Sequence, residues 1–227
     1  MRPWLAGERS LQRLNALSES RQLKTESGRP VRFVPPGAKD AYYEIKVYET
    51  GRVETRPDSL HDFFNALAWL AFPRTKARIN AMHAAEIPRE GGQRGALRDL
   101  LTILDEGGAI VQCDDPELLS LLKNFQWKEL FWDRRAQVRA AMRILVLGHA
   151  VLEKALEPWP GVTCKAIMVQ AAADPDTAAL AWLDQLPPGA SPRIMSPLPV
   201  FGFPGWLPQD EAFYDDARYF RPLRPNA

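Results

Sequence analysis

The stretch Leu60–Ile87, LHDFFNALAWLAFPRTKARINAMHAAEI, decides the fold. Its apolar residues recur at helical spacing on both sides of Pro73. Proline lacks a backbone N–H and disfavours helical conformation in the preceding residue, so we expect two helices joined at Phe72–Arg74, or one kinked helix. Asp58 or Ser59 is placed to cap the first of them.

Segments with strand character flank this helix pair. Short runs rich in β-branched and aromatic residues predict strands at Val31–Val34 and Tyr42–Tyr48, and a turn at residues 49–52 predicts Val53–Arg56 as the hairpin partner of the second strand. We expect a mixed sheet built from Tyr42–Tyr48, Ala109–Cys113, Arg143–Leu147 and Val162–Val169. Further helices are expected at Ala96–Glu106, from Pro116 behind an Asp115 cap, at about Trp127–Arg139, at Ala150–Leu156 and at Asp174–Leu186.

The order of these elements predicts the fold class. Helices and strands alternate irregularly, which favours a mixed α/β (α+β) domain with a small mixed sheet flanked by helices. One continuous helix over residues 143–156 in an all-helical chain is the alternative. We divide the chain into a basic N-terminal arm, residues 1–30, and one domain, residues 31–227.

The segment from Pro187 to the end of the chain differs in composition from the rest. Eight prolines lie between residues 187 and 222, among many aromatic residues. Aromatic side chains in a proline-rich segment commonly anchor it to a domain surface, so we predict an ordered arm that wraps around the domain. Trp206, Phe213 and Tyr214 are expected to be buried, because an exposed aromatic cluster promotes aggregation.

Composition limits the class of partner. Lys and Arg number 29 against 28 Asp and Glu, a net charge of +1 that provides no general attraction for nucleic acid or an anionic membrane. No stretch has the apolar length of a membrane span, and the N-terminus does not resemble a signal peptide. Cys113 and Cys164 lie in apolar runs, which favours buried free thiols. We therefore expect a soluble, cytoplasmic protein.

The polar residues of the helix pair are the first candidates for a functional site. His61 and Asn65 share one face of the first helix, since they are four residues apart. Lys76, Asn80 and His83 share one face of the second. A hinge at Pro73 would bring the two faces together, near Asp62 and Arg56 in the sequence.

The last of the three histidines follows a different apolar run. If residues 143–148 form a strand, His149 lies at its carboxyl end, the edge at which open α/β sheets bind ligands. If the run is helical, His149 and Glu153 form an i, i+4 pair that suits a shared metal or a hydrogen bond.

Two interpretations of these residues remain open. In the first, they form a pocket in which His61, His83, His149 and Asp62 act as acid/base groups. Arg56, Asn65, Lys76 and Asn80 then contact the substrate, and a divalent metal is a candidate cofactor, with His61, His83, His149 and Glu153 as its candidate ligands. In the second, the same side chains cap helices and join segments through buried hydrogen bonds.

Several blocks of sequence resemble a known family. They are His61–Trp69 (HDFFNALAW), Phe72–Lys76 (FPRTK), Gly148–Ala150 with Glu153 and Lys154, Pro158–Gly161 (PWPG), Pro197–Pro199 with Gly202 and Pro204–Trp206, and Phe213–Asp216 ahead of Phe220–Pro222. Together they resemble the bacterial family called domain of unknown function 3025. Val151-Leu152 and Trp159 are conservative departures from its Leu-Tyr and Tyr.

The resemblance implies a bacterial cytoplasmic protein and carries no activity, cofactor or catalytic residue. Two hypotheses therefore stay open, and the sequence does not decide whether the chain is an enzyme. One is a small enzyme with a histidine, asparagine and lysine pocket for a small-molecule or phosphoester-type substrate. The other is a non-catalytic scaffolding domain that engages a protein partner through its aromatic tail and basic arm.

Overall fold

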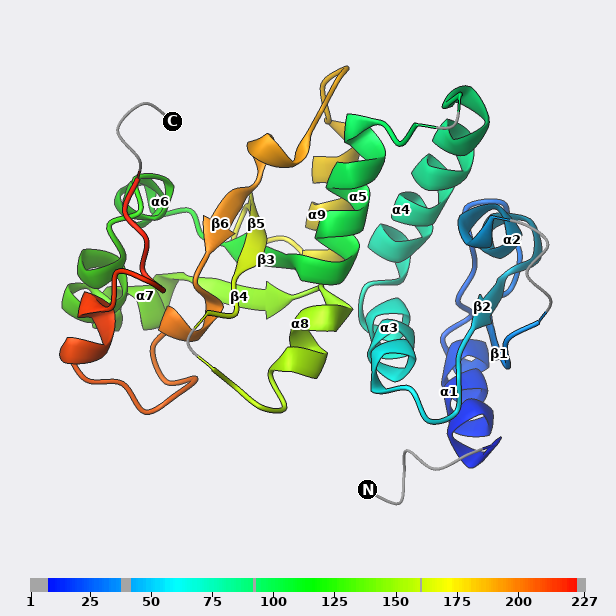
Figure 1. Ribbon diagram of the computed structural model, residues 1–227, viewed down its shortest axis with the longest axis horizontal. Coiled ribbons are helices and arrows are strands. Elements are labelled where there is room, and N and C mark those ends of the chain that lie inside the picture. The colour runs from blue at the N-terminus through cyan, green and yellow to red at the C-terminus, as the bar shows by residue number, and fades with distance from the viewer. Residues whose placement is uncertain (1–7, 38–41, 92, 160, 224–227) are drawn as a thin grey trace.

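The computed structural model describes residues 8–37, 42–91, 93–159 and 161–223 (Figure 1). It confirms the mixed α+β class, with helices around a two-stranded and a four-stranded sheet. Within those ranges, no helix is both long enough and apolar enough to cross a membrane. Cys113 and Cys164 are buried free thiols, as predicted.

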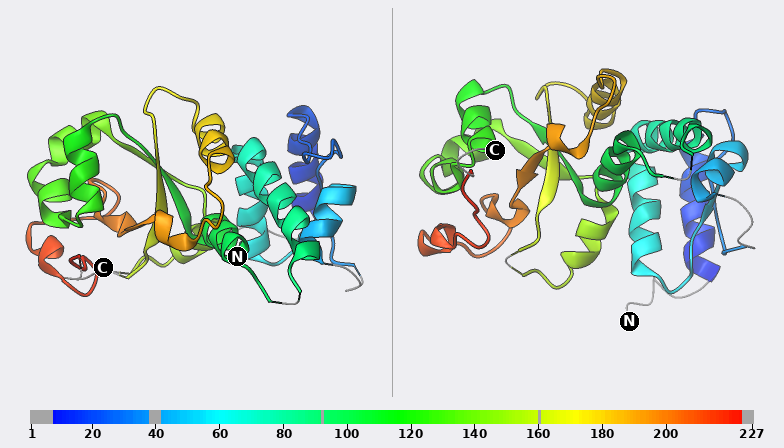
Figure 2. Two further views of the ribbon diagram at one scale, coloured as in Figure 1. Left: turned by 90° about the horizontal axis from the view of Figure 1, so that it is seen from above. Right: turned by 45° about the horizontal axis from the view of Figure 1, so that its top comes forward.

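The N-terminal segment forms a small unit at one end of the molecule (Figure 2). It contains α1 (Glu8–Ser20), β1 (Arg32–Val34), α2 (Tyr43–Thr50) and β2 (Arg52–Glu54). The two strands pair in parallel, with α2 in the connection between them. The described part of the basic arm is not a loose extension, because Leu11 and Leu14 of α1 are buried in a cluster with Phe33 and Trp69.

The prediction of a strand at Tyr42–Tyr48 is wrong, because this segment is helix α2. Its aromatic and β-branched residues favour strand locally, but tertiary contacts decide otherwise. Glu44 accepts a hydrogen bond from Asn80, and Val47 is buried. The helix ends at Gly51, whose φ of 72° is left-handed, and a Cβ there would lie 2.1 Å from the Pro30 carbonyl oxygen. The predicted hairpin partner, Val53–Arg56, therefore pairs with β1 instead.

The central helix pair forms as predicted, as two helices rather than one kinked helix. These are α3 (Leu60–Ala71) and α4 (Pro73–Glu86). Pro73 occupies the first position of α4, where its missing N–H costs nothing. Ser59 caps α3 by accepting a hydrogen bond from the backbone N–H of Asp62.

The four-stranded sheet has the order β4-β3-β5-β6. Its strands are β3 (Gly108–Gln112), β4 (Arg143–Val146), β5 (Cys164–Val169) and β6 (Ser196–Leu198). Strands β3 and β5 are parallel, and both outer strands are antiparallel to their neighbours. The predicted strands at residues 109–113, 143–147 and 162–169 are therefore confirmed, with slightly different ends.

Five α-helices accompany this sheet: α5 (Ala96–Gly107), α6 (Pro116–Lys123), α7 (Arg135–Ala141), α8 (His149–Lys154) and α9 (Pro175–Asp184). Asp115 caps α6 and Pro116 is its first residue, as the sequence predicts. The helix expected at 127–139 is divided, because Glu129–Asp133 is a π-helix and Arg134 is not helical.

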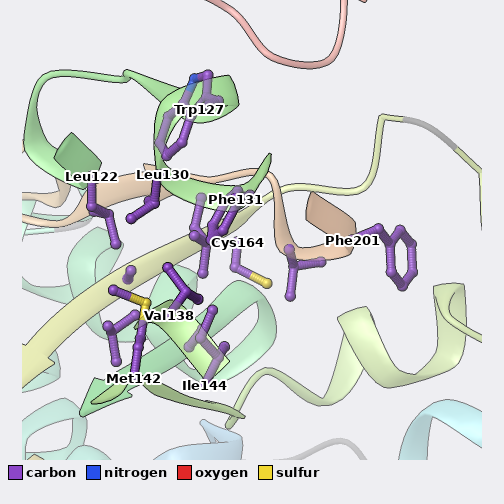
Figure 3. Close-up of a cluster of buried hydrophobic side chains, with 14 of the residues drawn as sticks. Leu122, Trp127, Leu130, Phe131, Val138, Met142, Ile144, Cys164 and Phe201 are labelled. Atoms are coloured by element: carbon purple, nitrogen blue, oxygen red, sulfur yellow. The ribbon is translucent and has the colours of Figure 1, made fainter. Parts of the chain in front are cut away.

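The sheet separates two hydrophobic clusters. Ala109 and Val111 of β3 pack with residues of α6, α7 and the tail, and Figure 3 shows part of this cluster. Ile110, on the opposite face, packs with Leu101 and Leu104 of α5 and with α9. The alternation along β3 explains why the whole strand is buried.

The described part of the tail, residues 187–223, packs against the domain, as predicted. Tyr214 is buried and Phe213 is half-buried. The expected burial of Trp206 is wrong, since this side chain is 39% exposed. Tyr219 attaches the end of the tail to the segment before β5, because its hydroxyl donates to the Val162 carbonyl oxygen (2.9 Å) and accepts from the Phe201 N–H (2.9 Å).

Replacing Tyr219→Phe should lower the free energy of unfolding by about 1–3 kcal/mol, because a buried N–H and a buried carbonyl lose their partner. Urea denaturation measures this. Tyr42→Phe is the matched control, since Tyr42 is 64% exposed. Equal stability of the two variants would show that the tail is not held by Tyr219.

Candidate functional site

Two of the three histidines meet between α3 and α8, which lie side by side (Figure 1). The Nε2 atoms of His61 and His149 are 3.1 Å apart, a hydrogen-bond distance. The rings meet edge to face, with centroids 4.5 Å apart. His61 is the second residue of α3, and His149 is the first residue of α8, which follows strand β4. The contact therefore joins the helix pair to the end of a sheet strand.

A carboxylate lies beside the other nitrogen of each ring. His61 Nδ1 is 3.3 Å from Glu153 Oε2, and His149 Nδ1 is 3.8 Å from Asp105 Oδ2. The two ends differ in exposure: the His61 side chain is 37% exposed, whereas that of His149 is 5% exposed. The array therefore runs from solvent at Glu153 to the interior at Asp105.

Burial keeps His149 neutral. Burial lowers the pKa of His149 to about 4; the Asp105 carboxylate opposes this shift, and the charges of Lys76 and His61 add to it. A neutral imidazole has one N–H and one acceptor nitrogen. His149 Nδ1 is buried without a hydrogen-bond partner among the described residues, and the Asp105 carboxylate at 3.8 Å is an electrostatic neighbour beyond hydrogen-bond distance. Because a bare nitrogen facing a carboxylate is unfavourable, we assign the N–H of His149 to Nδ1, which leaves Nε2 to accept a hydrogen bond from His61.

The interior end of the array is a buried ion pair. Lys76 Nζ contacts Asp105 Oδ1 and donates to Asn65 Oδ1 (2.8 Å), and the Lys76 side chain is 4% exposed. Burial alone would raise the pKa of Asp105, but the charge and hydrogen bond of Lys76, together with the charges of His149 and His83, outweigh it and hold the pKa below its usual range. The polar faces of α3 and α4 therefore meet as the sequence predicts.

A small cavity of about 20 Å³ adjoins this pair. Asn80 donates to the Glu44 carboxylate (2.6 Å), and Tyr43 and Trp69 complete its walls. Burial raises the pKa of Glu44. Asn80 Oδ1 has no hydrogen-bond partner among the described residues, and the cavity has room for about one water molecule.

The third histidine has a different neighbour. Arg98 Nε donates to His83 Nδ1 (3.4 Å). Arg98 Nη1 donates to the Glu90 carboxylate (2.7 Å). Burial, and then the charge of Arg98, lower the pKa of His83 to about 4. His83 shares a face of α4 with Lys76 and Asn80, but its contact is with Arg98 of α5 and it does not touch the other two histidines among the recorded contacts of the described residues.

Two other predicted residues pair at the surface. Arg56 makes a bidentate contact with Asp62, at 2.8 and 2.9 Å. The Arg56 side chain is 63% exposed. Asp62, which follows His61 on α3, thus holds the exposed guanidinium of Arg56. Among the recorded contacts of the described residues, Asp62 touches neither histidine ring.

The arrangement does not favour the proposed metal ligands. Glu153 faces Nδ1 of His61 while His149 faces Nε2, so the three side chains do not point at one position. In the described part of the chain, no three His, Cys, Asp or Glu side chains are grouped so as to hold a metal ion.

His149 follows strand β4, as expected. Because β4 is antiparallel to β3, however, the histidine lies at the end of the sheet opposite the carboxyl ends of β3 and β5.

Sequence reasoning missed three residues of this site: Tyr43, Glu44 and Asp105. The first two were assigned to a strand. Asp105 did carry a signal, because it lies four residues after Leu101 and follows Leu104, both fully buried on α5. An acid on the apolar face of an amphipathic helix requires a partner.

Residues 31–224 match the family described as protein of unknown function (DUF3025). The chain belongs to this family. No curated protein and no solved structure matches it. The family description assigns no activity, so the function has to be argued from the site.

Replacing Lys76→Met should destabilise the fold by about 3–5 kcal/mol, because it leaves the Asp105 carboxylate buried without its counter-charge. The double variant Lys76→Met/Asp105→Leu should lose less than the sum of the two single changes. Denaturant unfolding of all four proteins measures the coupling. Additive losses would show that the pair is not coupled.

The two buried histidines predict how stability depends on pH. Their pKa values of about 4 lie below the ordinary value of 6.5, so the unfolded chain binds more protons between these limits. Stability should therefore rise as pH increases from about 4 to about 6.5, by on the order of 2–3 kcal/mol for each histidine. In His83→Gln/His149→Gln the rise should be much smaller. A wild-type slope in the double variant would contradict this assignment.

Proposed function

We propose that this protein is an enzyme that uses His61 as a general acid and base on a small-molecule substrate. The observation that carries the proposal is the 3.1 Å contact between His61 Nε2 and His149 Nε2, backed by Asp105. Pairs of titratable groups in contrasting environments are typical of acid/base sites.

The hydrogen-bond directions assign a role to each nitrogen. With its N–H directed at Asp105, His149 presents the acceptor Nε2 to His61, so the His61 Nε2 carries hydrogen. His61 Nδ1 is then the atom that gains or loses a proton. Asp105 and His149 are positioning residues, because they fix the ring of His61 without facing the solvent.

Glu153 supports the acid form of this pair. A carboxylate only accepts hydrogen bonds, so the contact with His61 Nδ1 exists when that nitrogen carries hydrogen. Once the proton has passed to substrate, the bare Nδ1 and the carboxylate repel one another. The half-exposed Glu153 side chain, 42% exposed, then leaves Nδ1 open to solvent and ready to accept a proton.

The remaining predicted residues divide into supporting and substrate-facing groups. Lys76 donates to both Asp105 and Asn65, and Asn80 donates to Glu44. These contacts favour support of the site over contact with substrate. Arg56 is the exposed cation nearest to His61 in sequence, so we propose it as the contact for an anionic group, including that of a phosphoester.

His61→Gln should abolish proton-transfer catalysis, with a loss on the order of 10²–10⁴-fold, while the melting temperature changes little because His61 is a partly exposed residue. Hydrolysis of p-nitrophenyl acetate and p-nitrophenyl phosphate by the purified chain is a direct assay. Asn80→Ala, which removes a buried partner of Glu44, should instead lower the melting temperature.

His83→Gln is the matched control, since it removes the one histidine that is outside the pair. Activity that falls in His61→Gln but persists in His83→Gln supports the proposal. If wild type turns over neither ester, or if His61→Gln is as active as wild type, the acid/base proposal fails for these substrate classes. A large stability loss in His61→Gln would favour the scaffolding alternative.

A further inference from the structure

A second hollow lies far along the chain from the histidines, where the tail meets α7. Its volume is about 450 Å³, within the range of small-molecule sites. One wall comes from the π-helix and α7, and the other from the tail. The residues that matter for its chemistry are Trp132, Arg135, Arg139, Leu207, Gln209 and Tyr214.

The charged residues that line this hollow are both arginines. Arg135 and Arg139 are four residues apart on α7, so their like charges are neighbours on one helix face. Neither makes an ion pair with an acid in the part of the chain that the structure describes. Two adjacent unneutralised guanidinium groups in a concave wall favour an anion.

The rest of the lining is aromatic or apolar. The Arg135 guanidinium lies 4.2 Å from the centre of the Trp132 ring, a cation–π contact. Its Nη1 donates to the Trp132 carbonyl oxygen (3.4 Å), and its Nε and Nη2 have no recorded partner among the described residues, so they can donate to an oxyanion. Tyr214 and Leu207 belong to the facing wall. This combination suits a ligand that has an apolar ring as well as a negative charge.

The hollow is built by ordered segments. Tyr214 donates from its hydroxyl to the Gly202 carbonyl oxygen (3.0 Å), and Gln209 donates to the carbonyl oxygens of Phe201 and Phe203, the latter at 3.1 Å. The π-helix Glu129–Asp133 shapes the opposite wall by burying Leu130 and Phe131. Such π-helical turns are common at functional sites.

We propose that this hollow binds a small organic anion, an aromatic ring that bears a carboxylate or a phosphate. Arg135 and Arg139 hold the oxygens, since guanidinium groups match both anions in bidentate geometry. Trp132, whose ring packs against that of the buried Tyr214 at 5.9 Å, and Leu207 give the ligand's ring an apolar surface. A larger hollow of about 650 Å³ is lined by both Asp114 and Lys123, so its lining does not select a charge in the same way.

Isothermal titration of the full chain tests the proposal with four probes: phenyl phosphate, phenylacetate, inorganic phosphate and 2-phenylethylamine. At least one aromatic anion should bind saturably, and the amine should not. Whichever anion binds more tightly identifies phosphate or carboxylate as the natural group. Arg135→Gln and Arg139→Gln should each weaken that binding about tenfold or more.

Arg143→Gln is the matched control, because Arg143 is an exposed cation at the start of β4 and does not line the hollow. Its affinity for the aromatic anion should equal that of wild type. The proposal is overturned if neither aromatic anion binds, if the amine binds as tightly, or if both arginine variants keep wild-type affinity. Equally tight binding of inorganic phosphate would overturn the role of the ring.

Discussion

The buried ion pair between Lys76 and Asp105 is the interaction on which the rest of the site depends. It joins α4 to α5, and Asn65 extends it to α3. An ammonium group 4% exposed is tolerated only with a counter-charge, so the pair fixes how these helices pack. The same carboxylate faces His149, which carries the effect on to α8. The Asp105 carboxylate therefore organises the seam at which α3 and α4 meet α5 and α8.

Much of this seam is predictable from the sequence, and what is not has a physical reason. Proline at position 73 and the spacing of His61, Asn65, Lys76 and Asn80 give two helices with facing polar stripes, because helix geometry is local. The contact between His61 and His149, 88 residues apart, depends on packing and has no local signal. Residues 42–48 have strand-like composition but form helix α2, in which Val47 is buried and Glu44 accepts from Asn80, and these tertiary contacts have no local signal either.

Solvent exposure gives chemically similar residues different roles. The inner histidine, His149, is kept neutral by burial, while His61 shares its hydrogen bond and faces solvent. The arginines near the tail show the reverse situation, since Arg135 and Arg139 are exposed cations beside an aromatic wall with no acid in the lining. The first arrangement favours proton transfer, and the second favours anion binding. Burial of His149 and exposure of the two arginines account for the difference, because burial disfavours the charged form of a side chain.

The most direct test of the account is nitrogen-15 NMR of the imidazole rings at neutral pH, assigned with single His→Gln variants of the three histidines. The account predicts that His149 carries hydrogen on Nδ1 and accepts at Nε2, and that His61 carries hydrogen on Nε2. A hydrogen on Nε2 of His149 with Nδ1 bare toward Asp105 would contradict it, because His61 would then lack the orienting partner that its proposed role requires.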